Sequence, residues 1–288
     1  MDKARIKQVL KRLIDRRPVN NVSVTIHTLP HNELLLGRCA LVTGGTSGIG
    51  FFIAQAFLDA GAYVIITGRN RERLDNAIMK LNSDKKVYGL ELNNTDIPAF
   101  DEKFNDVLAT VQKDGISQID ILVNNAGVNY QGMPNATEEE YDQVMDTNLK
   151  GAFFLSQMFG KYLVKNQIKG NILNIASASS LRPADSAYIL SKWGLRGLTL
   201  GLAKALGPNG ITVNGIAPGP TATPMMIKGE CNNMAIDRIP LGRYIMPEEI
   251  ANMAVVLVSE MGRSVMGDII YMTGGAGLLT YDDVKYSF

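Results

Sequence analysis

The sequence has few of the residue types that build a disulfide scaffold or a metal site. It contains two cysteines, Cys39 and Cys231, and two histidines, His27 and His31, in 288 residues. The cysteines lack metal-ligand spacing, and the histidines have no third candidate ligand nearby. Such sparse cysteine use is typical of a reducing compartment and excludes a fold built on disulfides. We therefore expect no metal site.

Excess charge and long apolar runs are also missing. The net charge is +1, which argues against a nucleic-acid partner. No apolar stretch is long enough to cross a bilayer, and the first residues do not resemble a secretory signal. We therefore expect a cytoplasmic protein that binds neither nucleic acid nor a membrane. Apolar residues make up 46% of the chain, enough for the core of one large α/β domain.

The first 36 residues differ in pattern from the rest. Apolar residues recur at helical spacing over 6–14, and residues 1–17 hold seven Lys/Arg against two Asp/Glu. Pro18 ends this predicted helix, and 22–26 alternates like a short strand. We divide the chain into an N-terminal extension, residues 1–36, and a main domain, residues 37–288. The helix is expected to pack on its own domain or on a neighbouring subunit; the alternative is a basic amphipathic helix for a membrane surface or an acidic partner.

The main body alternates short apolar runs with longer amphipathic stretches. Several runs are almost continuous in Val, Ile and Leu, as in strands that are buried on both faces. The runs are 38–43, 63–67, 86–92, 119–124, 171–176, 211–217 and 268–272. Predicted helices between them include 49–60, 98–112 and 187–205. This alternation predicts a parallel sheet with helices on both faces.

A glycine-rich turn follows the first of these runs. Thr43 to Gly50 reads Thr-Gly-Gly-Thr-Ser-Gly-Ile-Gly and leads into a predicted helix. Glycine lets the backbone approach a pyrophosphate, and the helix N-terminus offers free N–H groups to the anion. The spacing is not G-x-G-x-x-G, and glycines also occur in plain turns. Its place between a buried strand and a helix favours a dinucleotide site.

The second run ends at Gly68-Arg69-Asn70. A carboxylate at this position would bind the ribose 2′-hydroxyl of NAD, whereas an arginine accommodates the 2′-phosphate of NADP. An arginine here is also common as a solvated surface residue. The missing acid and the adjacent Arg69 together favour NADP(H), with NAD(H) possible.

Tyr188 and Lys192 are four positions apart, so they share one face of the predicted helix. A nearby ammonium would lower the tyrosine pKa and allow Tyr188 to act as a general acid or base. Ser177, at the end of the preceding strand, could hydrogen-bond a developing alkoxide. The same spacing also occurs where a Tyr ring simply packs on a Lys stem. Its position after a dinucleotide turn favours catalysis.

Six motifs in this order resemble the short-chain dehydrogenase/reductase family, over about residues 37–277. They are Thr-Gly-x-x-x-Gly-x-Gly at 43–50, Asn-Asn-Ala-Gly at 124–127, Asn148 within Asp-Thr-Asn-Leu, Ser177, Tyr188-x-x-x-Lys192, and Pro218-Gly219 followed by Thr223. The resemblance implies a Rossmann-type doubly wound parallel sheet of seven strands with helices on both faces. It also implies a homo-oligomer, tetramer or dimer.

The resemblance further implies NAD(P)-dependent hydride transfer to or from a ketone/secondary alcohol pair. Asn148, Ser177, Tyr188 and Lys192 would form the catalytic tetrad, with Tyr188 as proton donor and Asn148 anchoring a water. The implied cofactor-binding residues are Gly44, Thr46, Ser47, Gly48, Ile49, Gly50, Arg69, Asn70, Leu92, Asn93, Asn125, Ala126, Gly127, Tyr188, Lys192, Pro218, Gly219, Thr221 and Thr223.

The sequence departs from the family pattern in several places. Eleven positions separate Ser177 from Tyr188, two fewer than usual, so the loop between them is either trimmed or shapes an unusual pocket. Asn93 replaces the usual Asp near the adenine, and Thr273 replaces the usual Asp before Gly274-Gly275. The alternative to an enzyme is a catalytically silent NADP(H)-binding sensor or scaffold. The complete tetrad argues against this alternative, because a binding protein would not need it. A nucleotide-sugar dehydratase or epimerase would have different glycine spacing.

Overall fold

A computed structural model describes residues 23, 32–81, 87–225, 233–237 and 239–277. These residues form a seven-stranded parallel sheet with the order β3-β2-β1-β4-β5-β6-β7. The strands are β1 (Cys39–Val42), β2 (Tyr63–Gly68), β3 (Val87–Glu91), β4 (Ile121–Asn124), β5 (Asn171–Ile175), β6 (Thr212–Pro218) and β7 (Ile269–Met272). The order reverses between β1 and β4. This is the switch point where open α/β sheets place their ligands.

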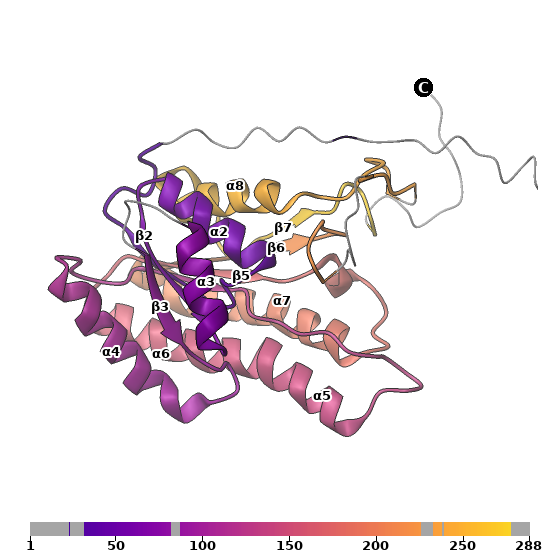
Figure 1. Cartoon of the computed structure of the whole chain (residues 1–288), viewed down its shortest axis with the longest axis horizontal. Coiled ribbons are helices and arrows are strands. Elements are labelled where there is room, and N and C mark those ends of the chain that lie inside the picture. The colour runs from indigo at the N-terminus through magenta and orange to yellow at the C-terminus, as the bar shows by residue number, and fades with distance from the viewer. Residues whose placement is uncertain (1–22, 24–31, 82–86, 226–232, 238, 278–288) are drawn as a thin grey trace, which may run out of the picture.

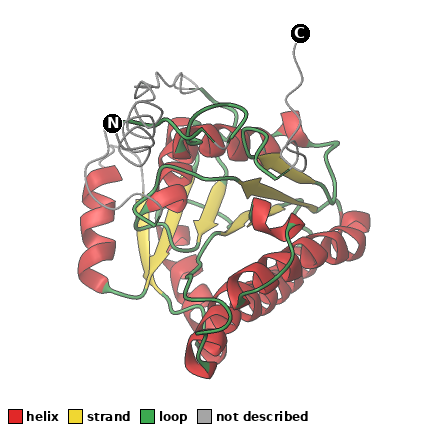
Figure 2. Ribbon diagram, turned by 90° about the vertical axis from the view of Figure 1, so that its right-hand side faces the viewer, coloured by secondary structure: helices red, strands yellow, loops and turns green. Residues whose placement is uncertain are grey.

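Helices cover both faces of the sheet, as the sequence pattern predicted (Figure 1; Figure 2, helices red and strands yellow). One face carries α2 (Gly48–Asp59), α3 (Arg71–Leu81) and α8 (Pro247–Val258). The other carries α4 (Phe100–Lys113), α6 (Gly151–Lys165) and α7 (Ala187–Leu206). The helix α5 (Glu138–Met145) packs on α7. The seven predicted runs each match one strand, and their ends differ from the observed ends by at most two residues.

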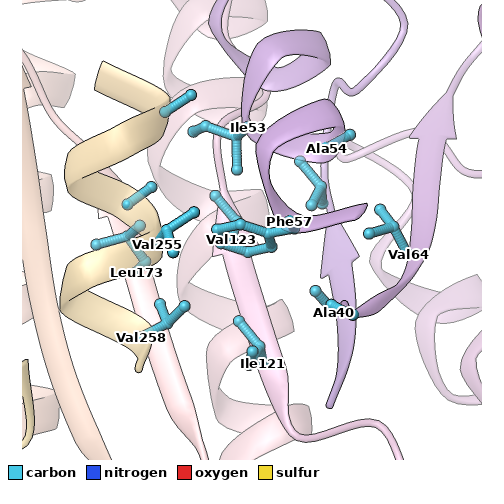
Figure 3. Close-up of a cluster of buried hydrophobic side chains, with 14 of the residues drawn as sticks. Ala40, Ile53, Ala54, Phe57, Val64, Ile121, Val123, Leu173, Val255 and Val258 are labelled. Carbon is cyan, nitrogen blue, oxygen red and sulfur yellow. The ribbon is translucent and has the colours of Figure 1, made fainter. Parts of the chain in front are cut away.

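The strands supply side chains to both faces in alternation. In β1, Ala40 and Val42 join the core beneath α2 and α8, while Cys39 and Leu41 join the core beneath α4 and α6. Figure 3 shows Phe57 of α2 and Val255 of α8 converging on the first of these cores. Both are buried, and this burial fixes the N-terminus of α2 over the edge of the sheet where β1 ends.

A π-helical turn, η2 (Asp146–Lys150), joins α5 to α6 and interrupts what is otherwise one long helix. Such turns are rare and cluster at functional sites. Asn148 lies within this turn and is almost fully buried. The interruption therefore falls on a residue that the sequence motifs singled out. Short 3₁₀ turns complete the architecture: η1 (Ile97–Ala99), η3 (Ala178–Leu181), η4 (Gly207–Asn209) and η5 (Glu260–Gly262).

The helix predicted over 6–14 and nearly all of the strand predicted over 22–26 lie outside the described residues. The division of the chain at residue 36 therefore stays a proposal. The described chain reaches the main body at Asn32, whose N–H donates to the Asp59 carbonyl, and Leu35 is fully buried. Among the helices that the structure describes, none is long and apolar enough to cross a membrane.

Candidate active site

The glycine-rich turn is fixed to the neighbouring strand by Thr43, which is fully buried at the end of β1. Its hydroxyl donates to the Val123 carbonyl at 3.2 Å and accepts the N–H groups of Asn125 and Ala126 at 2.9 and 3.0 Å. One side chain thus joins the carboxyl ends of β1 and β4. The glycine-rich turn and the Asn-Asn-Ala-Gly motif, on the two sides of the switch point, are thus held together at the base of the site.

The glycines of the turn are required by close packing. A Cβ on Gly50 would lie 2.3 Å from the Asn125 Nδ2 and 2.6 Å from the Gly44 carbonyl oxygen. Gly44 and Gly48 have φ angles of 63° and 57°, the left-handed region that glycine enters without cost. The Asn125 amide donates to the carbonyls of Thr43 and Gly44 at 2.9 and 3.2 Å. Asn125 therefore braces the turn as well as bordering the site.

The N-terminus of α2 opens onto a cleft of about 790 Å³ that crosses the carboxyl ends of the strands. Ser47, the N-cap, makes no side-chain capping bond, so the first N–H groups of α2 remain available to an anion. All of the predicted cofactor residues except Gly50 line this cleft. Gly50 lies behind Asn125 and shapes the cleft indirectly. The close-packed turn and the uncapped helix end fit a dinucleotide pyrophosphate.

At the β2 end of the cleft, two arginines are exposed on its wall. Gly68 cannot carry a side chain without displacing the Thr46 methyl group, 2.7 Å from its would-be Cβ. Arg69 follows, and Arg73 reaches the cleft from the first turn of α3. Sequence reasoning missed Arg73, although its place in the first helical turn after β2 was a signal. Among the described lining residues, Asp185 carries the single carboxylate, and it follows β5 rather than β2.

The catalytic candidates meet where β5 leaves the sheet. Ser177 is buried and caps η3, its hydroxyl oxygen accepting the Ser179 N–H at 3.1 Å. Tyr188, in the first turn of α7, hydrogen-bonds the Ser177 side chain through its hydroxyl. The shortened loop between them therefore still brings the two hydroxyls together. A serine and a phenol side by side on a cleft wall can both bond one carbonyl oxygen.

The electrostatics of Tyr188 differ from the sequence expectation. Burial raises the pKa of Tyr188 above its usual value, and the bond from Ser177 offsets part of this. Lys192 is not among the groups that lower the pKa of Tyr188. Its Nζ donates to the Ile175 carbonyl at 2.8 Å and lies 5.5 Å from the centre of the Tyr188 ring. Burial lowers the pKa of Lys192 to about 8. In this arrangement desolvation therefore outweighs the expected lowering of the Tyr188 pKa.

Asn148 does not line the cleft and acts as a brace. Its Oδ1 accepts the Val128 N–H at 2.8 Å, and its Nδ2 donates to the Val128 carbonyl at 2.9 Å and to the Ser191 hydroxyl at 3.2 Å. It thus joins the segment after β4 to the helix that carries Tyr188 and Lys192. Its predicted role in anchoring a water stays a prediction.

The far wall of the cleft begins where β6 ends. Pro220 and Ala222 exchange backbone hydrogen bonds with Ile245 at 2.9 and 2.8 Å, and the Thr221 hydroxyl donates to the Gly219 carbonyl at 2.9 Å. Gly219 packs against Thr273, which a Cβ would approach to 2.8 Å. The segment from Pro218 to Thr223 is therefore held on two sides. It lines the same cleft as Tyr188.

The cleft combines a turn that fits a dinucleotide with two neighbouring hydroxyls and a buried lysine. This combination is typical of nicotinamide-dependent oxidoreductases. Comparison with known proteins supports this class. A family model described as enoyl-(acyl carrier protein) reductase matches residues 44–277. The chain is 38% identical over 247 residues to a 3-oxoacyl-[acyl-carrier-protein] reductase of Thermotoga maritima, covering 84% of this chain and 98% of that protein. It is 36% identical over 251 residues to a 3alpha-hydroxysteroid dehydrogenase of Mediterraneibacter gnavus, covering 84% and 98%.

Solved structures agree with the sequence comparison. A 3-oxoacyl-[acyl-carrier protein] reductase from Brucella melitensis matches with a TM-score of 0.78 at 27% identity, covering 90% of this chain and 99% of that one. A putative gluconate dehydrogenase from Agrobacterium tumefaciens matches with a TM-score of 0.76 at 31% identity, covering 85% and 98%. The chain belongs to the short-chain dehydrogenase/reductase family. It is an NAD(P)-dependent enzyme acting on CH-OH groups, and its fold confirms the predicted seven-stranded Rossmann-type sheet.

Proposed function

We propose that this enzyme prefers NADP(H) and interconverts a ketone and a secondary alcohol, with Tyr188 as general acid and base. The observation that carries the proposal is the Ser177–Tyr188 hydrogen bond beside buried Lys192, on the wall of a cleft whose floor is the glycine-rich turn. The nicotinamide ring, when bound, supplies the hydride.

Each catalytic side chain has a defined task in the reducing direction. The carbonyl oxygen of the substrate accepts hydrogen bonds from Ser177 and Tyr188. As the hydride reaches the carbonyl carbon, Tyr188 donates its proton to the oxygen, so that no free alkoxide forms. Lys192 would bind the ribose hydroxyls of the cofactor, and its Nζ lies 5.5 Å from the centre of the Tyr188 ring. In oxidation the same steps run in reverse.

Arg69 and Arg73 support the preference for NADP(H), since two guanidinium groups at the β2 end suit a 2′-phosphate. We expect wild type to bind NADPH at least tenfold more tightly than NADH. Replacing both arginines by alanine should weaken NADPH binding roughly ten- to a hundredfold and leave NADH binding almost unchanged. Fluorescence titration of each cofactor measures this.

Arg71→Ala is the matched control, because Arg71 pairs with Asp75 at 3.0 Å and does not line the cleft. It should leave both affinities unchanged. Tighter binding of NADH by wild type would overturn the assigned preference.

The carbonyl substrate is tested with a panel, because the relatives named above act on different compounds. We propose following NADPH oxidation against ketones, keto acids, sugars and acyl thioesters. Turnover of at least one class is expected. Cofactor binding without turnover of any compound would favour the alternative of a catalytically silent sensor or scaffold.

We also propose that the enzyme forms a homo-oligomer through α6 and α7, which pack next to each other. Phe153 and Phe154 on α6 and Trp193 and Leu200 on α7 are large apolar side chains between 38% and 52% exposed. A gathering of such side chains on adjacent helices is typical of a subunit interface. A second copy of the same chain is the occupant that we propose.

A further inference from the structure

The cleft wall carries one more basic side chain than the proposed cofactor and proton transfer would use. Among the described residues that line it, four are basic and one is acidic. Arg69 and Arg73 are assigned to the cofactor phosphate, and Lys192 is assigned to the ribose and the phenol. Arg182 is the remaining basic residue, and neither the cofactor nor the proton transfer uses it.

Arg182 lies at the opposite end of the cleft from Arg69. Its Nε and Nη2 are 3.8 and 3.9 Å from the position of a Cβ on Gly277, beyond β7. Arg69 follows β2, and four strands stand between β2 and β7 in the sheet. A guanidinium that follows β5 and lies near the segment after β7 is on the other side of the switch point from Arg69, away from the site proposed for the adenosine phosphate. It lies on the side where β5, β6 and the segment after β6 enclose the reacting groups.

The backbone around Arg182 is held to the catalytic helix. Its N–H donates to the Ser179 carbonyl at 3.1 Å, and its carbonyl accepts the indole N–H of Trp193 at 2.9 Å. Pro183 follows, which restricts both residues to extended conformations. Trp193 is adjacent to Lys192, so the position of Arg182 is coupled to that of the proton-transfer group.

The guanidinium has no carboxylate partner among the ion pairs that involve described residues. Asp185 lines the same cleft but forms no ion pair with Arg182 at 4.0 Å or less. The Asp185 backbone is bound on the other side of the loop, where its carbonyl accepts the Met133 N–H at 2.8 Å. The shortened loop thus carries one cation and one anion that both line the cleft and do not pair with each other.

We propose that Arg182 binds an anionic group of the substrate, a carboxylate or a phosphate, and that the enzyme acts on an oxo-acid/hydroxy-acid pair or its phosphate equivalent. This inference rests on the proposed function and adds the substrate class. A guanidinium binds either anion with two parallel hydrogen bonds, which would also orient the carbonyl toward Ser177 and Tyr188. Met133, Ile189 and Met225 line the cleft nearby and would contact the carbon chain between the two groups.

The test compares matched substrates that differ only in charge. Oxo-carboxylates of increasing length are assayed beside their methyl esters, and hydroxyketone phosphates beside the free hydroxyketones. Wild type should favour the anionic member of the carboxylate series or of the phosphate series by roughly tenfold or more in kcat/KM. Arg182→Gln should abolish this preference mainly by raising KM for the anion, with the neutral compound almost unaffected.

Arg196→Gln is the charge-matched control. The Arg196 guanidinium lies 5.8 Å from the centre of the Trp193 ring and does not line the cleft, so the preference for the anion should survive. Equal turnover of anionic and neutral compounds by wild type would overturn the assignment of Arg182, yet would leave the proposed hydride transfer intact. An equal loss for both compounds in Arg182→Gln would also overturn it, since that result indicates a structural role.

A second readout does not depend on turnover or on the variant folding. Trp193 is the single tryptophan of the chain and bonds the Arg182 carbonyl. Titration of the wild-type enzyme with a saturating cofactor and a hydroxy acid should change its fluorescence. The corresponding uncharged alcohol should need at least tenfold higher concentration. Identical titrations by the acid and the alcohol would contradict the proposal.

Discussion

Tyr188 is subject to two opposing influences on its pKa. Burial raises the pKa because it removes water from the charged phenolate, which loses more solvation than the neutral phenol does. The hydrogen bond from Ser177 lowers the pKa by stabilising the phenolate. Reduction needs the protonated phenol, so its kcat/KM should be steady below this pKa and fall above it. Oxidation should show the opposite dependence.

Replacing Ser177 by alanine removes the influence that lowers the pKa. The alkaline fall of kcat/KM for reduction should therefore move to higher pH. The maximal rate should also drop roughly tenfold to a thousandfold, because a donor to the carbonyl oxygen is lost. Ser179→Ala is the control, since Ser179 contacts Ser177 through its backbone N–H and should keep the wild-type profile. A pH–rate profile that does not move in Ser177→Ala would contradict this account.

At this scale the sequence predicted side chains, Ser177, Tyr188 and Lys192, that line one cleft, but it did not predict their electrostatics. The spacing of Tyr188 and Lys192 correctly placed both residues on one face of α7. The expectation that the ammonium lowers the Tyr188 pKa was wrong for this arrangement, because it ignored burial and the bond from Lys192 to the Ile175 carbonyl. Both are tertiary features that a four-residue spacing does not contain. Arg73 was missed for a similar reason, since its approach to the cleft depends on how α3 packs.

Among the elements, the connection after β6 depends on an ion pair at the start of α8. Arg243 donates two hydrogen bonds to Glu249, both at 2.8 Å, and Glu249 also accepts the Met246 N–H at 2.8 Å. The neighbouring Ile245 pairs with Pro220 and Ala222 on the cleft wall. The pair therefore fixes one end of the segment that forms this wall of the cleft.

Glu249→Gln should destabilise the folded enzyme by about 1–3 kcal/mol at neutral pH. Arg243 lowers the pKa of Glu249 below its usual 4.5, so this stabilisation is present above that value and is lost as the pH falls through the lowered pKa. Urea unfolding at several pH values should show the wild-type advantage shrinking below about pH 4.5. An advantage that persists unchanged at lower pH would contradict the assignment.

Glu260→Gln is the control for this prediction. Glu260 faces Arg263 at 3.8 Å with its side chain 81% exposed, and such surface pairs contribute little. Its unfolding curve should overlay that of wild type.

The sequence also predicted most elements, because buried parallel strands and amphipathic helices each have a distinct apolar period. It did not predict the π-helical turn at Asn148. The extra residue per turn accompanies the contacts of Asn148 with Val128 and Ser191, which join parts of the chain that are distant in the sequence. It likewise gave no indication of how the segment after β6 folds back on itself.

For the whole molecule, the main expectation is self-association through α6 and α7. Introducing a charge on this apolar surface should disrupt the interface because an unpaired glutamate would be buried there. Phe153→Glu combined with Leu200→Glu should convert the oligomer to a smaller species, measured by light scattering coupled to gel filtration. Met79→Glu is the control: Met79 is 65% exposed but lies on α3, on the other face of the sheet. A wild-type monomer would contradict the expectation.

The central claim is proton transfer by Tyr188 coupled to hydride transfer, and Tyr188→Phe tests it most directly. The variant keeps the ring that packs near Lys192 and loses only the hydroxyl. We would measure NADPH binding by fluorescence and single-turnover NADPH oxidation with the best substrate of the panel, side by side with wild type. The account predicts cofactor affinity within a few-fold of wild type and a rate lower by roughly 10²–10⁴. A Tyr188→Phe enzyme that oxidises NADPH at the wild-type rate would contradict it.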